Sequence, residues 1–141
     1  LGVSYYFVGR FDDAIQSYKK AFHLYPDDYE FLNSIGVIYS EVGRLDDAIQ
    51  SYEKAIAINP NVADVLNNMA IVLTKLNRLD EAYKYNEKAL KINPKYSEGF
   101  VVQGHIYKEL NRLEDALFSF EQANTLNPEL PYILGTILSA K

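Results

Sequence analysis

The sequence repeats itself every 34 residues, and this period restricts the fold more than any other feature of the chain. Four columns of identical residues keep the same step along its 141 residues. These columns are Pro26, Pro60, Pro94 and Pro128; Ala14, Ala48, Ala82 and Ala116; Ala21, Ala55, Ala89 and Ala123; and Arg10, Arg44, Arg78 and Arg112. A period of this length is typical of solenoids, in which each unit buries its apolar surface only against its neighbours.

Each unit contains the pattern of two helices, which is clearest in residues 29–62. Leu32, Ile35 and Tyr39 have the spacing of one helical stripe. After an interruption a second stripe follows, and Pro60 ends it, because the residue before a proline is pushed out of the helical region. The second stripe comprises Ala48, Ile49, Tyr52, Ala55 and Ile56.

The interruption between the two helices falls on Gly9, Gly43, Asn77 and Asn111, which share one position of the repeat. Glycine and asparagine are the residues that best tolerate the left-handed conformation at the C-terminal end of a helix. The sequence therefore predicts a break at this position in every unit. Residues 1–8 are accordingly expected to form a short first helix.

The predicted fold class is all-α, a right-handed solenoid of antiparallel helix hairpins. A partial first repeat covers residues 1–28. Complete repeats cover 29–62, 63–96 and 97–130, and residues 131–141 start a further or capping helix. Leu1, Val3 and Ile137 are among the apolar residues at the two ends, where more chain is expected to cover them in the native protein. Self-association through such ends is one alternative for the function.

These residues resemble the tetratricopeptide repeat, a 34-residue unit with a small residue and an aromatic in its first helix and Ala, an aromatic, Ala and Pro in and after its second. Repeat 29–62 has Gly36, Tyr39, Ala48, Tyr52, Ala55 and Pro60 in this pattern. Repeat 63–96 departs from it, because Ala70, Leu73 and Asn86 replace the glycine and two aromatics. The resemblance implies a non-catalytic module that binds a peptide or a partner helix in a concave groove.

The groove is expected on one arc of the first helix of each repeat, at positions 2, 5, 6, 9, 12 and 13. Amides there can pair with the backbone of an extended peptide, while an apolar mid-line takes its side chains. The selected groove residues are Asn33, Ser34, Val37, Ser40, Asn67, Asn68, Ile71, Thr74, Val101, Val102 and His105. Relatives that capture a terminal carboxylate have cations where this chain has Asn33, Glu98 and Val102, so that ligand is not expected.

The C-terminal segment 131–141 is similar to the junction between repeats and catalytic domain in bacterial O-linked N-acetylglucosamine transferase-like proteins. Those repeats carry an asparagine ladder, which Asn68 matches and Ser34 and Val102 do not. This alternative makes the chain the substrate-recognition region of a glycosyltransferase whose catalytic domain lies outside it. Whether the full-length parent is an enzyme is left open.

Composition argues against several other functions. The net charge of −5 is unsuited to non-specific binding of nucleic acid, and no apolar run is long enough to span a membrane. The chain has no cysteine, two histidines in different repeats and no glycine-rich phosphate loop. Neither a catalytic residue, nor a metal site, nor a cofactor is therefore predicted. The compartment is not fixed, with the cytoplasm slightly favoured.

Overall fold

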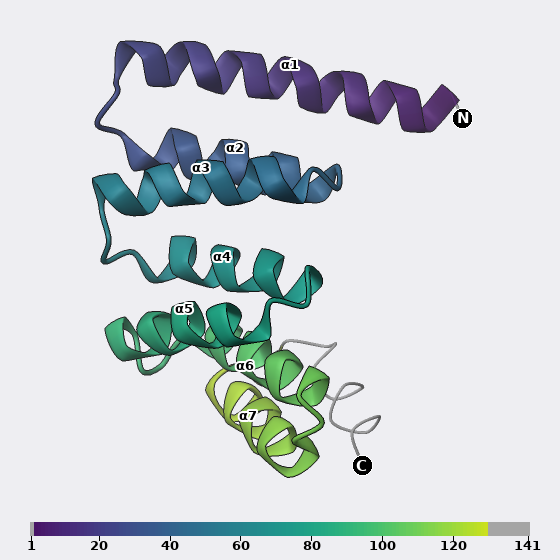
Figure 1. The fold of residues 1–141 in the computed structure, drawn as a ribbon, viewed down its shortest axis with the longest axis vertical. Coiled ribbons are helices and arrows are strands. Elements are labelled where there is room, and N and C mark those ends of the chain that lie inside the picture. The colour runs from purple at the N-terminus through teal and green to yellow at the C-terminus, as the bar shows by residue number, and fades with distance from the viewer. Residues whose placement is uncertain (1, 130–141) are drawn as a thin grey trace.

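The computed structural model describes residues 2–129, and their side chains from residue 9 onward. Within this range the chain forms a stack of helices that follow one another along the long axis of the molecule (Figure 1). The helices are α1 (Gly2–Leu24), α2 (Tyr29–Glu41), α3 (Leu45–Ile58), α4 (Ala63–Lys75), α5 (Leu79–Ile92), α6 (Ser97–Glu109) and α7 (Leu113–Leu126). The fold is an all-α helical-repeat solenoid, as the sequence predicts.

Three hairpins make up most of the stack: α2 packs on α3, α4 on α5, and α6 on α7. Successive hairpins contact each other through α3 and α4 and through α5 and α6. The first helices of the hairpins also touch, because α4 contacts both α2 and α6. The consequence is one face built by α2, α4 and α6, which is the face on which the sequence places the groove.

The turn inside each hairpin has the conformation that its sequence predicts. Gly43 has φ 84°, and the equivalent residues Asn77 and Asn111 have φ 59° and 60°. The amide of Arg44, which follows Gly43, donates to the carbonyl of Tyr39 at 2.8 Å. This bond satisfies a carbonyl that the end of α2 would otherwise leave unpaired.

The predicted break at Gly9 is wrong, because α1 continues without interruption from Gly2 to Leu24. Gly9 is not among the residues with positive φ, and a Cβ atom at this position would have no neighbour within 4 Å. Glycine permits a left-handed turn but does not impose one, and each residue that continues a helix adds a backbone hydrogen bond. The first repeat is thus a single long helix, not a short helix followed by a second.

The conserved spacing of small residues within the chain reflects close helix packing. The alanines at 48, 82 and 116 and those at 55, 89 and 123 are completely buried. Gly36 and Gly104 have an aromatic ring directly against the backbone, from Tyr52 and Phe120 respectively. The small side chains therefore let the two helices of a hairpin approach, and they fix the surface that each hairpin offers to the next.

Candidate functional site

Two neighbouring hollows lie on the face that α2, α4 and α6 build. The first, of about 520 Å³, lies between α4 and α6, and the second, of about 420 Å³, lies between α2 and α4. They share Ile71 and Lys75, so that together they form one groove across three repeats. The first is lined by Ile71, Thr74, Lys75, Asn77, Val102, His105 and Glu109, and the second by Val37, Ser40, Glu41, Tyr52, Asn68, Ile71 and Lys75.

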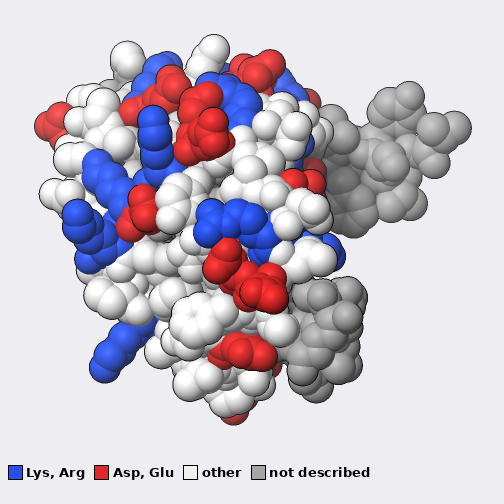
Figure 2. All heavy atoms as spheres, turned by 60° about the horizontal axis from the view of Figure 1, so that its bottom comes forward, with Lys and Arg blue, Asp and Glu red and all other residues white. Residues whose placement is uncertain are grey.

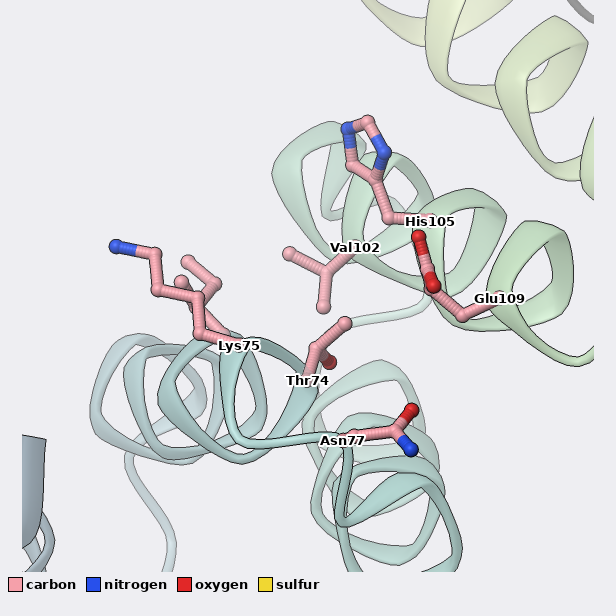
Figure 3. A pocket seen from close by; sticks show the side chains of 7 residues that line it. Thr74, Lys75, Asn77, Val102, His105 and Glu109 are labelled. Carbon is pink, nitrogen blue, oxygen red and sulfur yellow. The ribbon is translucent and has the colours of Figure 1, made fainter.

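The first hollow is apolar at its centre and polar around its rim. In Figure 3, Thr74 of α4 and Val102 of α6 point toward one another across it. His105 and Glu109 extend from α6 along one side, and Lys75 from α4 along another (Figure 3). A groove with an apolar floor and charged edges can bury apolar side chains of a ligand and orient the ligand through its polar groups.

An asparagine pair joins two repeats next to the second hollow. The Nδ2 of Asn68 donates to the Oδ1 of Asn33 at 3.0 Å, and both side chains are half-buried. One donor of Asn68 and one lone pair of Asn33 are thereby used within the protein. The Nδ2 of Asn33 and the Oδ1 of Asn68 keep capacity for a ligand, because each amide has two donors and two acceptor lone pairs.

Two of the residues that the sequence assigns to the groove do not face it. Asn67 is 3% exposed and Val101 is 6% exposed. Both occupy the fifth position of their repeat, and Val101 packs in a core cluster with Phe120 and Ala123. The fifth position therefore faces neighbouring helices, as Asn33 does where it bonds to Asn68 of the next repeat. The arc predicted from 100° per residue was therefore too wide at this edge.

The remaining predicted residues are mostly brought together. Val37, Ser40, Asn68, Ile71, Thr74, Val102 and His105 line the two hollows. Ser34 is half-buried and lines neither of them, while Asn33 reaches the site through its bond to Asn68.

The prediction left out the charged residues Glu41, Lys75 and Glu109, which line the hollows and share position 13 of the predicted arc. Their position on that arc was the signal that could have found them. Asn77 was also missed as a lining residue, because its turn-forming role accounts for it in the sequence.

His105 is the histidine at the edge of the groove. Although His105 is exposed, partial desolvation of its ring and then the neighbouring Lys108 lower its pKa from the usual 6.5, because both disfavour the protonated ring. The ring lies edge-on to Phe120, with 5.2 Å between the ring centroids. His105 is therefore largely neutral near pH 7, where it offers both a hydrogen-bond donor and an acceptor.

Among the residues that the structure describes, no group of three or more His, Asp and Glu side chains could hold a metal ion. None of the helices in this range is both long and apolar enough to cross a membrane.

The stacked hairpins define a helical-repeat protein. Three models of the tetratricopeptide repeat match residues 1–63, 39–100 and 98–130, and together they span nearly the whole sequence. The chain therefore belongs to the tetratricopeptide repeat family. No curated protein matches the sequence significantly.

Solved structures share the fold at low sequence identity. A crystal structure of MamA is 23% identical, with a TM-score of 0.81 over 94% of this chain and 77% of its own. MamA 41-end from Desulfovibrio magneticus RS-1 is 19% identical, with a TM-score of 0.81 over 99% and 80% of the two chains. The first tetratricopeptide domain of Spaghetti (RPAP3), bound to the HSP90 peptide SRMEEVD, is 22% identical, with a TM-score of 0.75 over 79% and 89%.

Segment 131–141, which carries the similarity to the transferase junction, lies outside the described residues, and so do the apolar side chains at both ends. The transferase context and the self-assembling scaffold therefore stay predictions. Only the repeats themselves are established by the family models.

Proposed function

We propose that this chain binds an extended segment of a partner protein in the groove along α2, α4 and α6. The observation that carries the proposal is that the two hollows are contiguous, since Ile71 and Lys75 belong to both. A continuous groove across three repeats suits an elongated ligand better than a compact small molecule. The RPAP3 domain, a protein of the same fold, was solved with a bound peptide, which supports this mode of use.

The side chains that line the groove indicate what kind of partner segment would fit it. Val37, Ile71 and Val102 supply apolar surface in successive repeats, so the segment should present apolar side chains at matching intervals. The free groups of Asn33 and Asn68 can pair with a peptide backbone, as strand-like ligands require. Lys75 is the one cation that lines these two hollows, so the groove lacks the group of cations that captures a terminal carboxylate.

The proposal is tested by selecting peptides from a random display library on the 141-residue chain and measuring their affinity for two variants. Ile71→Glu places a charge on the apolar mid-line that both hollows share. Ile92→Glu makes the same change at the end of α5, where Ile92 is 39% exposed and lines neither hollow. We expect Ile71→Glu to weaken binding about tenfold or more, and Ile92→Glu to leave it within about twofold.

Equal affinities of the two variants would contradict the groove as the binding site. A selection that yields no peptide able to bind the wild-type chain would also contradict the proposal. Asn68→Ala is a second informative variant, because it removes an amide from the groove edge. Asn67→Ala is unsuited to this purpose, since Asn67 is only 3% exposed.

A further inference from the structure

A separate hollow of about 550 Å³ lies where α1 meets the hairpin of α2 and α3. It shares no lining residue with the two hollows of the groove. Four basic side chains line it: Lys19 and His23 from α1, Arg44 from the turn before α3, and Lys54 from α3. The only acidic lining residue is Asp47, so the hollow is positive within a chain whose net charge is −5.

Two of these side chains, Lys19 and Arg44, approach the same aromatic ring. The Nζ of Lys19 lies 5.9 Å and the Cζ of Arg44 lies 4.8 Å from the centroid of the Tyr39 ring. Arg44 also pairs with Asp47 at 2.9 Å. Lys19, His23 and Lys54 form no ion pair with any of the residues that the structure describes. Positive charges gathered around one ring repel each other, and an anion placed among them would relieve that repulsion.

The equivalent places between later repeats contain such an anion as part of the protein. Glu53 and Glu87 follow Lys19 by one and two repeat lengths, just as Arg78 and Arg112 follow Arg44. The pKa of Arg78 is raised first by its hydrogen bond to Glu81 and then further by the carboxylate of Glu53.

The pKa of Tyr83 is raised first by its hydrogen bond with Tyr107 and then by Glu87. The Tyr107 ring in turn lies 4.7 Å from the Cζ of Arg112. The hollow at the third junction is also rich in lysine, because Lys84, Lys88 and Lys91 line it, but Glu87 lies among them. The first junction has Lys19 in place of that glutamate.

We propose that the hollow at the first junction binds a carboxylate-bearing ligand, with the carboxylate standing where Glu53 and Glu87 stand in the later repeats. The hollow is larger than one carboxylate requires, so an acidic side chain can enter together with neighbouring atoms of its own chain. The occupant we expect is therefore an acidic segment of a partner protein. This site adds to the proposed groove and does not depend on it.

The probe is a fluorescein-labelled (Glu-Ser)₄ peptide amide, titrated by fluorescence anisotropy against the 141-residue chain, with (Gln-Ser)₄ as its neutral match. Lys19→Glu supplies the missing carboxylate from the protein itself. Lys20→Glu makes the same charge change one residue further along α1, at an exposed residue that does not line the hollow. We expect Lys19→Glu to weaken binding of (Glu-Ser)₄ about tenfold or more, and Lys20→Glu to weaken it less than about threefold.

Competitors distinguish the possible sources of the anion. Free glutarate should displace the peptide more effectively than inorganic phosphate at equal concentration, because the site is built around a carboxylate. Stronger displacement by phosphate would overturn the carboxylate assignment. Equal effects of Lys19→Glu and Lys20→Glu, or equal binding of the two peptides, would overturn the site itself.

A stability measurement tests the same idea without any ligand. If cations in the hollow repel each other, Lys19→Glu should raise Tm relative to Lys20→Glu, since the new glutamate faces Arg44 as Glu53 faces Arg78. A Tm for Lys19→Glu that is equal to or lower than that of Lys20→Glu would contradict the proposal.

Discussion

The ring of Phe120 occupies the space that a side chain on Gly104 would need. The same relationship joins Tyr52 to Gly36, where an added Cβ would lie 2.5 Å from the Cε1 of the ring. Both rings are almost completely buried, so they have little room to move aside. Glycine in one helix and an aromatic in the other therefore form a matched pair that sets how closely the hairpin can pack.

Gly104→Ala should destabilise the protein, although alanine is the better helix former. Overpacking against Phe120 costs about 1–3 kcal/mol, which outweighs the gain of about 1 kcal/mol in helix propensity. Urea unfolding followed by circular dichroism gives the difference. Gly9→Ala is the matched control, because Gly9 is also helical but has open space around it. It should stabilise by about 0.5–1 kcal/mol. Destabilisation by both changes would contradict this account.

The third repeat replaces both members of the pair, with Ala70 in place of the glycine and Asn86 in place of the aromatic. Asn86 is completely buried, and its Nδ2 donates to the carbonyl of Gly99 at 2.8 Å. Its Oδ1 has no hydrogen-bond partner among the described residues. A smaller side chain in α5 leaves room for the extra methyl in α4, so the two departures compensate each other.

A double-mutant cycle at these two positions tests the compensation. Asn86→Phe alone should destabilise by about 1–3 kcal/mol, because its ring meets the Cβ of Ala70. Adding Ala70→Gly should restore at least about 1 kcal/mol, despite the low helix propensity of glycine. Free energies of unfolding of the two single variants and the double variant provide the cycle. Additive effects would show that the two positions do not compensate.

Gly43 is a turn residue at which the backbone conformation disfavours most side chains. With φ 84°, an alanine here should cost about 1–2 kcal/mol, whereas asparagine should cost less. The equivalent Asn77 and Asn111 adopt φ near 60° in the same turn, which shows that asparagine is compatible with it. Thermal unfolding of Gly43→Ala and Gly43→Asn measures the difference. Equal losses in the two variants would refute the argument from left-handed geometry.

His105 should make stability depend on pH. Because its pKa in the folded protein is below 6.5, the unfolded chain takes up a proton more readily as the pH falls. The stability that the folded protein gains from keeping this ring neutral is fully present above pH 6.5. It is lost as the pH falls through 6.5 toward the lower pKa of His105 in the folded protein. Between about pH 7.5 and 5.5, the wild-type chain should lose more stability than His105→Gln. Equal losses would contradict the lowered pKa.

The repeat period predicts most of this fold, because each helix end has its own local signal. The turns at Gly43, Asn77 and Asn111 are examples, since the residue type and the left-handed conformation correspond directly. Gly9 shows the limit: the same residue type sits inside a continuous helix, because glycine allows the turn without requiring it. Local signals therefore predict what the backbone can do, and packing decides whether it does so.

The groove is less predictable because it depends on contacts between repeats. Helical periodicity alone placed Asn67 and Val101 on the groove, whereas packing against neighbouring helices buries both. The bond between Asn33 and Asn68 likewise joins two repeats, so the sequence of either repeat alone does not predict it.

The face shown in Figure 2 carries both signs of charge, with Lys and Arg side chains interspersed among Asp and Glu. The basic hollow does not stand out in the composition, because the net charge of the chain is −5. What indicates it in the sequence is Lys19, which occupies the repeat position that Glu53 and Glu87 occupy in the later units.

The most direct test of the central claim is to map a selected peptide onto the chain by methyl NMR. Binding along α2, α4 and α6 predicts that the largest chemical-shift changes occur at the methyl groups of Val37, Ile71 and Val102, with little change at Leu90 and Ile92 of α5. Changes confined to α5, or changes at only one repeat, would contradict a continuous groove that holds an extended segment.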